Sequence, residues 1–407
     1  MEEKKYMYVL VAICTCFMAF GTMGLVNAYG VFYRPMAEAL STGTGAITLH
    51  MSISSLVTGF ATPFVVKMIS RNVPIKNILA FGALMIFGSG IVIGMTKSVW
   101  IMDFAAFFRG IGFASAAMMI ITMMIGNWFV KLRGTLTGIA LSFSGIGSAL
   151  ASPVLSRLIQ SYGYQPTYIG FIIFITVTIL PALLLCPLKP QDIGLRPYGE
   201  NEAEDTKVVN APKNLDLPFT TRSVTFMSLG LFVLCVVILT GLSSHLSALA
   251  QTYGYDANIG AVMLSAAMIG NVASKFLLGA LVDKIGALKG VIFMLITSFS
   301  GLAIILLNPG GTFLLLAGAF LYGSCFSIGS LGISMITRTL YGDKQYGNAY
   351  SVITVITSVA SAIGVTLIGI LYDVTGSYAI SVMGGMILIV TAFLCLMTII
   401  RKSRQTA

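Results

Sequence analysis

The chain has 407 residues, of which 57% are hydrophobic and only 9% are charged, and its formal net charge is +10. Soluble domains are about a quarter charged, so this composition excludes a chain built from soluble domains. An excess of basic over acidic residues can indicate a nucleic-acid partner, but here the positions of the charges provide another explanation.

Twelve apolar segments are long enough to form membrane helices, because a helix needs about 20 apolar residues to cross a hydrocarbon core of about 30 Å. Residues 290–337 lack Asp, Glu, Lys and Arg, and Asn308-Pro309-Gly310-Gly311 divides them into two helices. We therefore expect an all-α membrane protein with twelve transmembrane helices. In chain order they lie near residues 7–30, 46–66, 77–96, 100–124, 134–157, 167–187, 223–248, 259–282, 288–307, 312–335, 346–370 and 376–400.

The only long polar segment is 189–222, which mixes both charges with Pro and Gly and is typical of a flexible linker. It divides the chain into an N-terminal six-helix bundle, residues 1–188, and a C-terminal six-helix bundle, residues 223–407. Arg133-Gly134 and Tyr346-Gly347 open corresponding helices of the two halves. Two parallel halves of six helices are a known transporter architecture.

The basic residues fall mostly on one side of the expected membrane. Of those outside the helices, only Arg34, Lys97 and Arg157 fall on the other side. The positive-inside rule then places both termini in the cytoplasm, as expected for a multi-pass protein of the cytoplasmic (inner) membrane, and a nucleic-acid partner is not needed. The residues on the cytoplasmic side are Lys4, Lys5, Lys67, Arg71, Lys76, Lys131, Arg133, Lys189, Arg196, Lys207, Lys213, Arg222, Lys284, Lys289, Arg338, Lys344, Arg401, Lys402 and Arg404.

Three local patterns bear on a resemblance to the major facilitator superfamily. Gly279-Ala-Leu-Val-Asp283-Lys284-Ile-Gly286, after the eighth helix, resembles the loop signature of that family, and Arg109-Gly110-Ile-Gly112 resembles its R-G-x-G element. The equivalent loop of the first half, 66–72, keeps basic residues but lacks the Gly and the Asp. The resemblance implies two pseudo-symmetric bundles and a conformational role for the 279–286 loop.

Within the superfamily, the chain resembles the oxalate/formate antiporter and monocarboxylate transporter branch. The similar segments are 27–35, 127–134 and the pair Lys275 and Gly279. Monocarboxylate transporters often have Asp and Arg where this chain has Asn271 and Lys275. The oxalate-type members also have Lys in the eleventh helix, where this chain has Ile353.

Lys275 is the strongest candidate for binding substrate. It lies about seven residues inside the eighth helix, where a charge costs a few kcal/mol unless it faces a cavity or a partner. Residues 257–282 contain no Asp or Glu, and position 271, one turn earlier, is Asn271. A substrate carboxylate is one candidate partner for the ammonium. The alternative is that the long side chain extends to the cytoplasmic interface.

Arg109 lies about nine residues inside the fourth helix. It either binds substrate or braces this helix against polar groups of the first helix, such as Asn27. The resemblance to the superfamily favours a conformational or coupling role.

The remaining candidates are histidines and tyrosines. His50 and His245 are the only histidines and lie near the outer ends of their helices. Because histidine titrates near neutral pH, each is a candidate for passing a proton, with a structural hydrogen bond as the alternative. Tyrosines can donate to a carboxylate, although interfacial belts explain most membrane tyrosines. The tyrosine candidates are Tyr29, Tyr322 and Tyr350.

No Asp or Glu lies in the middle of any expected helix, whereas Arg109 and Lys275 do. We therefore expect a secondary active transporter of a small organic anion, such as lactate, pyruvate or formate, that works by alternating access as a proton symporter or an anion exchanger. The alternative is an oxalate or dicarboxylate exchanger that uses Lys275 together with Arg109. The expected partners are the carboxylate, protons and the bilayer, and the chain is expected to act as a monomer.

Enzymes and channels fit the sequence less well. A membrane enzyme needs a nucleophile with a base or a metal set, and a channel needs a re-entrant filter or charged rings. Neither pattern is present, and no cofactor or metal is expected. The six cysteines lie in or at the ends of apolar segments without metal spacing.

Overall fold

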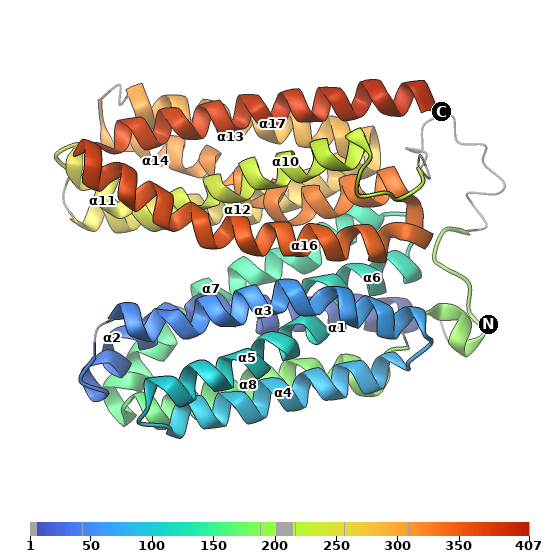
Figure 1. Cartoon of the computed structure of the whole chain (residues 1–407), viewed down its shortest axis with the longest axis horizontal. Coiled ribbons are helices and arrows are strands. Elements are labelled where there is room, and N and C mark those ends of the chain that lie inside the picture. The colour runs from blue at the N-terminus through green and yellow to red at the C-terminus, as the bar shows by residue number, and fades with distance from the viewer. Residues whose placement is uncertain are drawn as a thin grey trace. The chain divides into compact units, whose positions relative to one another are not determined.

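The computed structural model describes residues 6–42, 44–187, 189–200, 215, 217–255, 257–307 and 310–406. These residues are almost entirely helical, and the β-type pairing among them is an isolated bridge between Phe129 and Tyr198. The chain divides into two compact units, Met1–Lys207 and Val208–Ala407 (Figure 1). The expectation of an all-α membrane protein is confirmed.

Unit 1 is a bundle in which α3 packs on α5, α5 on α4, α4 on α8 and α1 on α7. Its first membrane span begins as an α-helix, changes to a π-helix and then to a 3-10 helix, and returns to an α-helix at Gly30. The elements are α1 (Tyr6–Ala19), η2 (Phe20–Leu25), η3 (Val26–Tyr29), α2 (Gly30–Ala39), α3 (Thr44–Ser70), α4 (Ile75–Met95), α5 (Val99–Ala116), α6 (Met118–Trp128), α7 (Arg133–Tyr162), α8 (Tyr164–Leu185) and η4 (Pro190–Ile193).

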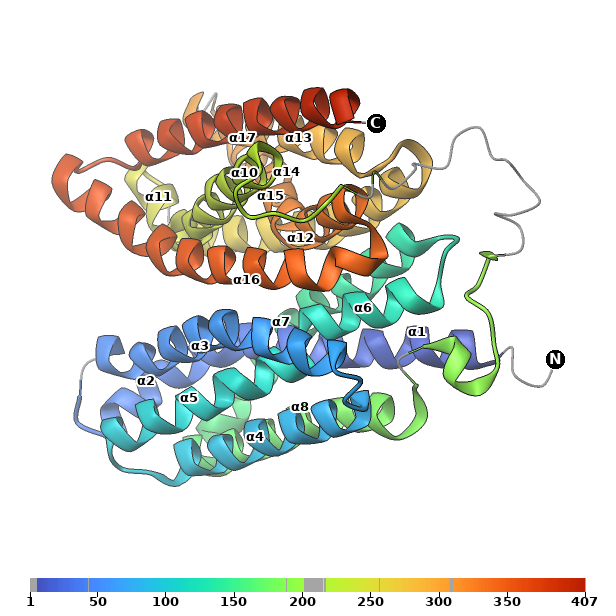
Figure 2. The ribbon, with the colours of Figure 1, turned by 45° about the vertical axis from the view of Figure 1, so that its right-hand side comes forward.

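Unit 2 is built in the same way, with α10 packed on α16 and α17, and α12 on α11, α13 and α14 (Figure 2). The elements are α10 (Val224–Thr240), η5 (Gly241–His245), α11 (Leu246–Thr252), α12 (Ala257–Ile285), α13 (Ala287–Leu307), α14 (Thr312–Tyr322), α15 (Ser324–Ser327), η6 (Ile328–Gly332), α16 (Ile333–Thr375) and α17 (Tyr378–Thr406).

Eleven helical segments of the described residues are long and apolar enough to cross a membrane. One of them, Thr312–Gly364, is 53 residues long and contains two crossings, the tenth and the eleventh. Helices α14 to α16 run together because the turn between these crossings interrupts the helix only at Gly342, whose φ of 63° and ψ of 175° are not helical. Because this segment contains two crossings, the eleven segments correspond to the twelve predicted spans.

The first, fourth, seventh and tenth spans, each of which begins a group of three consecutive spans, contain or end in irregular turns. The first span contains a π-helical turn and a 3-10 turn at residues 20–29, and the tenth contains a π-helical turn, η6. The fourth span breaks at Ala117, whose φ of −110° and ψ of −146° separate α5 from α6. The seventh span ends in the 3-10 turn η5. Such interruptions often mark functional segments, and sequence periodicity does not predict them.

Glycines bring α12 and α14 into close contact in unit 2. A Cβ added at Gly270 would lie 1.9 Å from the Phe320 carbonyl oxygen, and one at Gly323 would lie 2.2 Å from the Ala267 carbonyl oxygen. Close approach through small residues is the usual way in which membrane helices pack. This contact places α14 against the helical turn that carries Asn271.

Both ends of the polar segment 189–222 are hydrogen-bonded to a unit. The Tyr198 carbonyl accepts from the backbone N–H groups of Val130 and Lys131, and the Tyr198 N–H donates to the Trp128 carbonyl. At the other end, the Leu215 and Leu217 N–H groups donate to the carbonyls of Thr339 and Leu340. The segment is therefore anchored at the turn between the fourth and fifth spans and at the equivalent turn between the tenth and eleventh. Residues 201–214 lie outside the described part.

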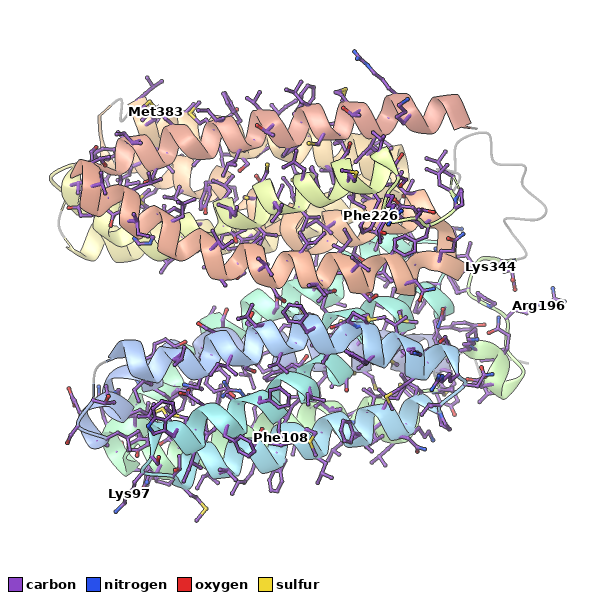
Figure 3. The ribbon with its side chains drawn as sticks, viewed as in Figure 1. Lys97, Phe108, Arg196, Phe226, Lys344 and Met383 are labelled. Atoms are coloured by element: carbon purple, nitrogen blue, oxygen red, sulfur yellow. The ribbon has the colours of Figure 1, made fainter. Side chains whose placement is uncertain are left out.

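Lys97 lies in the turn between α4 and α5, at the end of unit 1 opposite Arg196, and Lys344 and Met383 lie at opposite ends of unit 2 (Figure 3). Among the described residues, most of the basic residues predicted to face the cytoplasm lie in or near the α3–α4, α6–α7 and α12–α13 turns and the turn at Gly342.

Candidate functional site

Arg109 is fully buried in unit 1 and is held by groups from two other helices. Its Nε donates to Ser54 Oγ at 3.3 Å, and its Nη1 donates to the Tyr168 hydroxyl at 3.2 Å. Its Nη2 lies 3.2 Å from both the His50 carbonyl oxygen and Met51 Sδ. The guanidinium therefore joins α5 to α3 and α8 through neutral groups.

Tyr29 and His50 surround the same guanidinium. The Arg109 Cζ lies 5.1 Å from the centre of the Tyr29 ring, which is within cation–π range. The Tyr29 hydroxyl is buried near Arg109 and Tyr168 and has no hydrogen-bond partner of ordinary geometry among the described residues. His50 Nδ1 bonds the Ile47 carbonyl oxygen, and its buried Nε2 has no hydrogen-bond partner among the described residues.

The structure thus brings together three candidates from the sequence, Arg109, Tyr29 and His50. Asn27 lies in η3, but its side chain is outside the described residues. Ser54, Met51 and Tyr168 complete the cluster and were not predicted. No sequence signal marks Tyr168 as a partner of Arg109, because the two residues are 59 positions apart.

Lys275 is 3% exposed and lies on α12 of unit 2, ten residues before that helix ends at Ile285, or about 15 Å along its axis. Its neighbours Phe276 and Leu277 are 42% and 48% exposed. A lysine extended along the outer surface of the bundle would be exposed like these neighbours. The ammonium is instead surrounded by protein.

Asn271 is one helical turn from Lys275 and is 7% exposed. Residues four apart on a helix have Cβ atoms about 5–6 Å from each other, so the two side chains share one face of α12. The Asn271 side-chain oxygen is buried without a hydrogen-bond partner among the described residues. Ser274 Oγ donates to the Asn271 backbone carbonyl at 3.1 Å. This face of α12 therefore combines a cation with an amide oxygen that lacks a hydrogen bond.

Two candidate tyrosines of unit 2 already have close partners. The Tyr322 hydroxyl donates to the Leu239 carbonyl oxygen at 2.9 Å, at the point where α10 changes into η5. Tyr350 stacks on Tyr346 with ring centres 5.1 Å apart. Tyr322 therefore stabilises the irregular end of the seventh span.

His245 is the last residue of η5, at the end of unit 2 that also carries the turn between α16 and α17. Its Nδ1 lies 3.3 Å from the Tyr378 hydroxyl. It belongs to a different cluster from Lys275 and Asn271, one that includes aromatic residues of α16 and α17. The candidates of unit 2 thus fall into separate groups along the bundle.

Among the residues whose placement is described, no group of three or more His, Cys, Asp or Glu side chains could hold a metal ion. The buried polar side chains of the described residues include Arg109, Arg338, Lys275, His50 and Asn271, together with serine and threonine hydroxyls. Such groups can bind an anionic or neutral solute by charge and hydrogen bonding.

The family model described as Major Facilitator Superfamily matches residues 11–270 and 229–407 of the chain. The chain belongs to the major facilitator superfamily. It is therefore a multi-pass secondary transporter, and its relatives and fold are those of transporters rather than enzymes.

Relatives of this superfamily member include carriers for different solutes. It is 24% identical over 390 residues to Monocarboxylate transporter 13 of Rattus norvegicus, with 91% of this chain and 84% of the relative covered. It is 24% identical over 392 residues to the Agnestins efflux protein AgnL12 of Paecilomyces divaricatus, with 94% and 84% covered. The predicted resemblance to the monocarboxylate branch of the superfamily is confirmed.

Solved structures support the fold of this superfamily member. A structure of the E. coli fucose:proton symporter FucP aligns with a TM-score of 0.69 at 15% identity and covers 97% of this chain and 99% of its own. At this level of identity the likeness shows the fold alone.

The superfamily loop signature lies at the turn between α12 and α13. Gly279, Asp283 and Lys284 are on the last turns of α12, and Gly286 follows the helix with a φ of +89°. The first-half loop has Asn72 with a φ of +57° at its turn. Asn is one of the few residues other than Gly that adopt this conformation readily, so the first loop turns without the signature glycine.

Proposed function

We propose that this transporter carries a small organic monocarboxylate and that Lys275 binds the carboxylate group. The observation that carries the proposal is the burial of the Lys275 ammonium inside unit 2, on the same face of α12 as Asn271. A buried cation attracts an anionic group strongly, because charges interact more strongly away from water. An anionic substrate supplies both the charge and the acceptor oxygens.

The distribution of charge supports an anionic substrate. Arg109 and Lys275 lie well inside α5 and α12, while the acidic residues that the structure describes lie in turns or near helix ends. A transporter for cations would place a carboxylate where this chain has cations. The similarity to Monocarboxylate transporter 13 points to the same substrate class.

The one buried cation that we propose for the substrate, Lys275, favours one carboxylate over two. The alternative substrate, oxalate or another dicarboxylate, would require Arg109 as a second anion-binding group. Ser54, Tyr168, His50 and Met51 already contact the Arg109 guanidinium. Binding of a second carboxylate would have to displace several of these contacts, so we propose that Arg109 braces unit 1.

The choice of lysine suggests how protons can be coupled to the anion. Burial disfavours the charged form of an ammonium, and a bound carboxylate favours it. Lys275 can therefore take up a proton as the anion binds and lose it when the anion leaves. Arginine remains protonated at ordinary pH and cannot do this.

Transport in proteoliposomes tests this proposal. We expect labelled lactate, pyruvate or formate to exchange across the membrane, and an inward proton gradient to drive net uptake by the wild type. Lys275→Arg should keep exchange but lose uptake driven by the gradient. Exchange of a monocarboxylate that ignores the proton gradient would reject symport and leave anion exchange. No exchange of any monocarboxylate would reject the substrate class.

We also propose that both termini and the 189–222 segment face the cytoplasm, in the inner membrane, and that the carrier acts as a monomer. The basic residues in or near the α3–α4, α6–α7 and α12–α13 turns and the turn at Gly342 support this orientation. In a cysteine-free background, single cysteines at Ala203 and Gly310 should react with reagents from opposite sides. Labelling of position 203 in intact cells by an impermeant reagent would reverse the orientation.

A further inference from the structure

His245 and Tyr378 connect the end of the seventh span to the start of the twelfth. His245 Nδ1 lies 3.3 Å from the Tyr378 hydroxyl oxygen. The two ring centres are 5.7 Å apart, and the planes are tilted by 45°. Tyr378 is 5% exposed and His245 is half-buried, so the histidine is the more accessible of the two.

Tyr372, in the last turn of α16, extends this contact to the eleventh span. Its ring stacks on that of Tyr378 with centres 4.2 Å apart and planes 16° apart. The chain turns between α16 and α17 at Gly376, which has a φ of +66° and donates its N–H to the Tyr372 carbonyl oxygen at 2.7 Å. The three residues form an aromatic ladder, His245–Tyr378–Tyr372, which joins three spans of unit 2.

We propose that the His245–Tyr378–Tyr372 ladder is a proton-binding site through which the pH on its side of the membrane controls transport. The proposal rests on the function and orientation proposed above, which place the ladder at the outer surface. Its ligand is the proton itself, and it acts separately from Lys275.

The chemistry follows from the two ring nitrogens. In neutral histidine one nitrogen donates and the other accepts, so Nδ1 can accept the Tyr378 O–H. When the ring takes a proton from water, both nitrogens become donors, and Nδ1 must then donate to the tyrosine oxygen. The bond becomes charge-assisted, and the adjacent ring attracts the cation. Protonation therefore changes the strength of the connection between the seventh span and the other two.

Other titratable groups lie at this end of unit 2. Tyr253 and Tyr255 follow α11, and the Tyr253 hydroxyl is buried without a hydrogen-bond partner among the described residues. Asp256 and the Asp373 side chain lie outside the described part of the structure, and both belong in the test. His50 provides a matched control, since it is buried next to the Arg109 guanidinium, which repels a second positive charge.

The experiment uses the full-length carrier with ¹³C-labelled histidine, because the chain has only two histidines. His50→Gln and His245→Gln assign the two signals. When the pH is varied over about 5 to 8, the range in which histidines usually titrate, we expect the His245 signal to change and the His50 signal to remain fixed. Tyr378→Phe should shift the titration of His245. This measurement needs no substrate, so it decides the proton site even if the carboxylate proposal fails.

Uptake measured against external pH tests the control of transport. Over this range we expect wild-type uptake at a fixed proton gradient to change roughly threefold or more, and His245→Gln and Tyr378→Phe to flatten the profile. A His245 signal that does not titrate, or a profile unchanged in both ladder variants, overturns the proposal. It is also overturned if Asp256→Asn or Asp373→Asn removes the response while Tyr378→Phe preserves it.

Discussion

Lys275→Gln should fold and reach the membrane but bind its carboxylate about 10- to 100-fold more weakly. The substitution removes a charge-assisted hydrogen bond, which contributes about 1.5–3 kcal/mol, and each 1.4 kcal/mol corresponds to about tenfold in affinity. Stability should not fall, because the change also removes a buried charge. Binding by thermal shift or calorimetry, with transport measured in parallel, gives the affinity of both proteins.

Two further variants make this result specific. Lys289→Gln removes an exposed lysine from the start of α13, outside the loop signature at residues 279–286, and should leave affinity unchanged. Asn271→Asp places a carboxylate one turn from Lys275, where it can pair with the ammonium and compete with the substrate. We expect this variant to bind the anion more weakly while remaining at least as stable. Wild-type affinity in folded Lys275→Gln would show that Lys275 does not bind the substrate.

The span positions could be predicted because they depend on local composition. A membrane helix requires a long apolar stretch, and a turn such as the one at residues 308–311 has its own sequence pattern. The changes of helical type in the first, seventh and tenth spans could not be predicted in this way. At residues 20–29 the apolar composition simply continues while the backbone changes from α to π and then to 3-10 geometry.

The candidate site could be predicted only in part for a related reason. Lys275 and Asn271 stand out because they are polar residues four positions apart in an apolar helix, so their shared face follows from helix geometry. The partners of Arg109 do not follow from any local pattern. Tyr168 comes from another helix, and the His50 group that binds Arg109 is a backbone carbonyl, which every residue has. The Tyr378 partner of His245 is likewise 133 positions away.

The polar segment 189–222 shows how local composition can mislead. Its Pro, Gly and mixed charge are typical of a flexible linker, and that pattern says nothing about where the ends of the segment attach. Tyr198 forms backbone hydrogen bonds to the turn at residues 128–131, and Tyr8 packs against Trp128, Phe129 and Tyr198. The backbone bonds depend on two stretches of chain meeting in space, which composition does not encode.

Arg109→Met should destabilise unit 1 by about 3 kcal/mol, a large part of the roughly 5–15 kcal/mol that usually separates folded from unfolded proteins. Methionine keeps much of the length of the side chain but cannot donate to Ser54, Tyr168 or the His50 carbonyl. Those groups would remain buried without a donor, and hydrogen bonds to charged groups contribute about 1.5–3 kcal/mol each. Their sum is reduced because the substitution also removes a buried charge.

Arg109→Lys should be intermediate in stability, because one ammonium cannot reproduce the planar fork that contacts two other helices. Arg157→Met, at an exposed position of α7, is the matched control and should change stability by less than about 0.5 kcal/mol. Thermal unfolding of the purified variants, with and without substrate, separates the two roles of Arg109. If Arg109 braces unit 1, its substitution lowers the unfolding temperature of the free protein. If Arg109 binds substrate, its substitution leaves that temperature unchanged and abolishes the stabilisation by the anion. This second outcome would restore the dicarboxylate alternative, in which Arg109 and Lys275 act together.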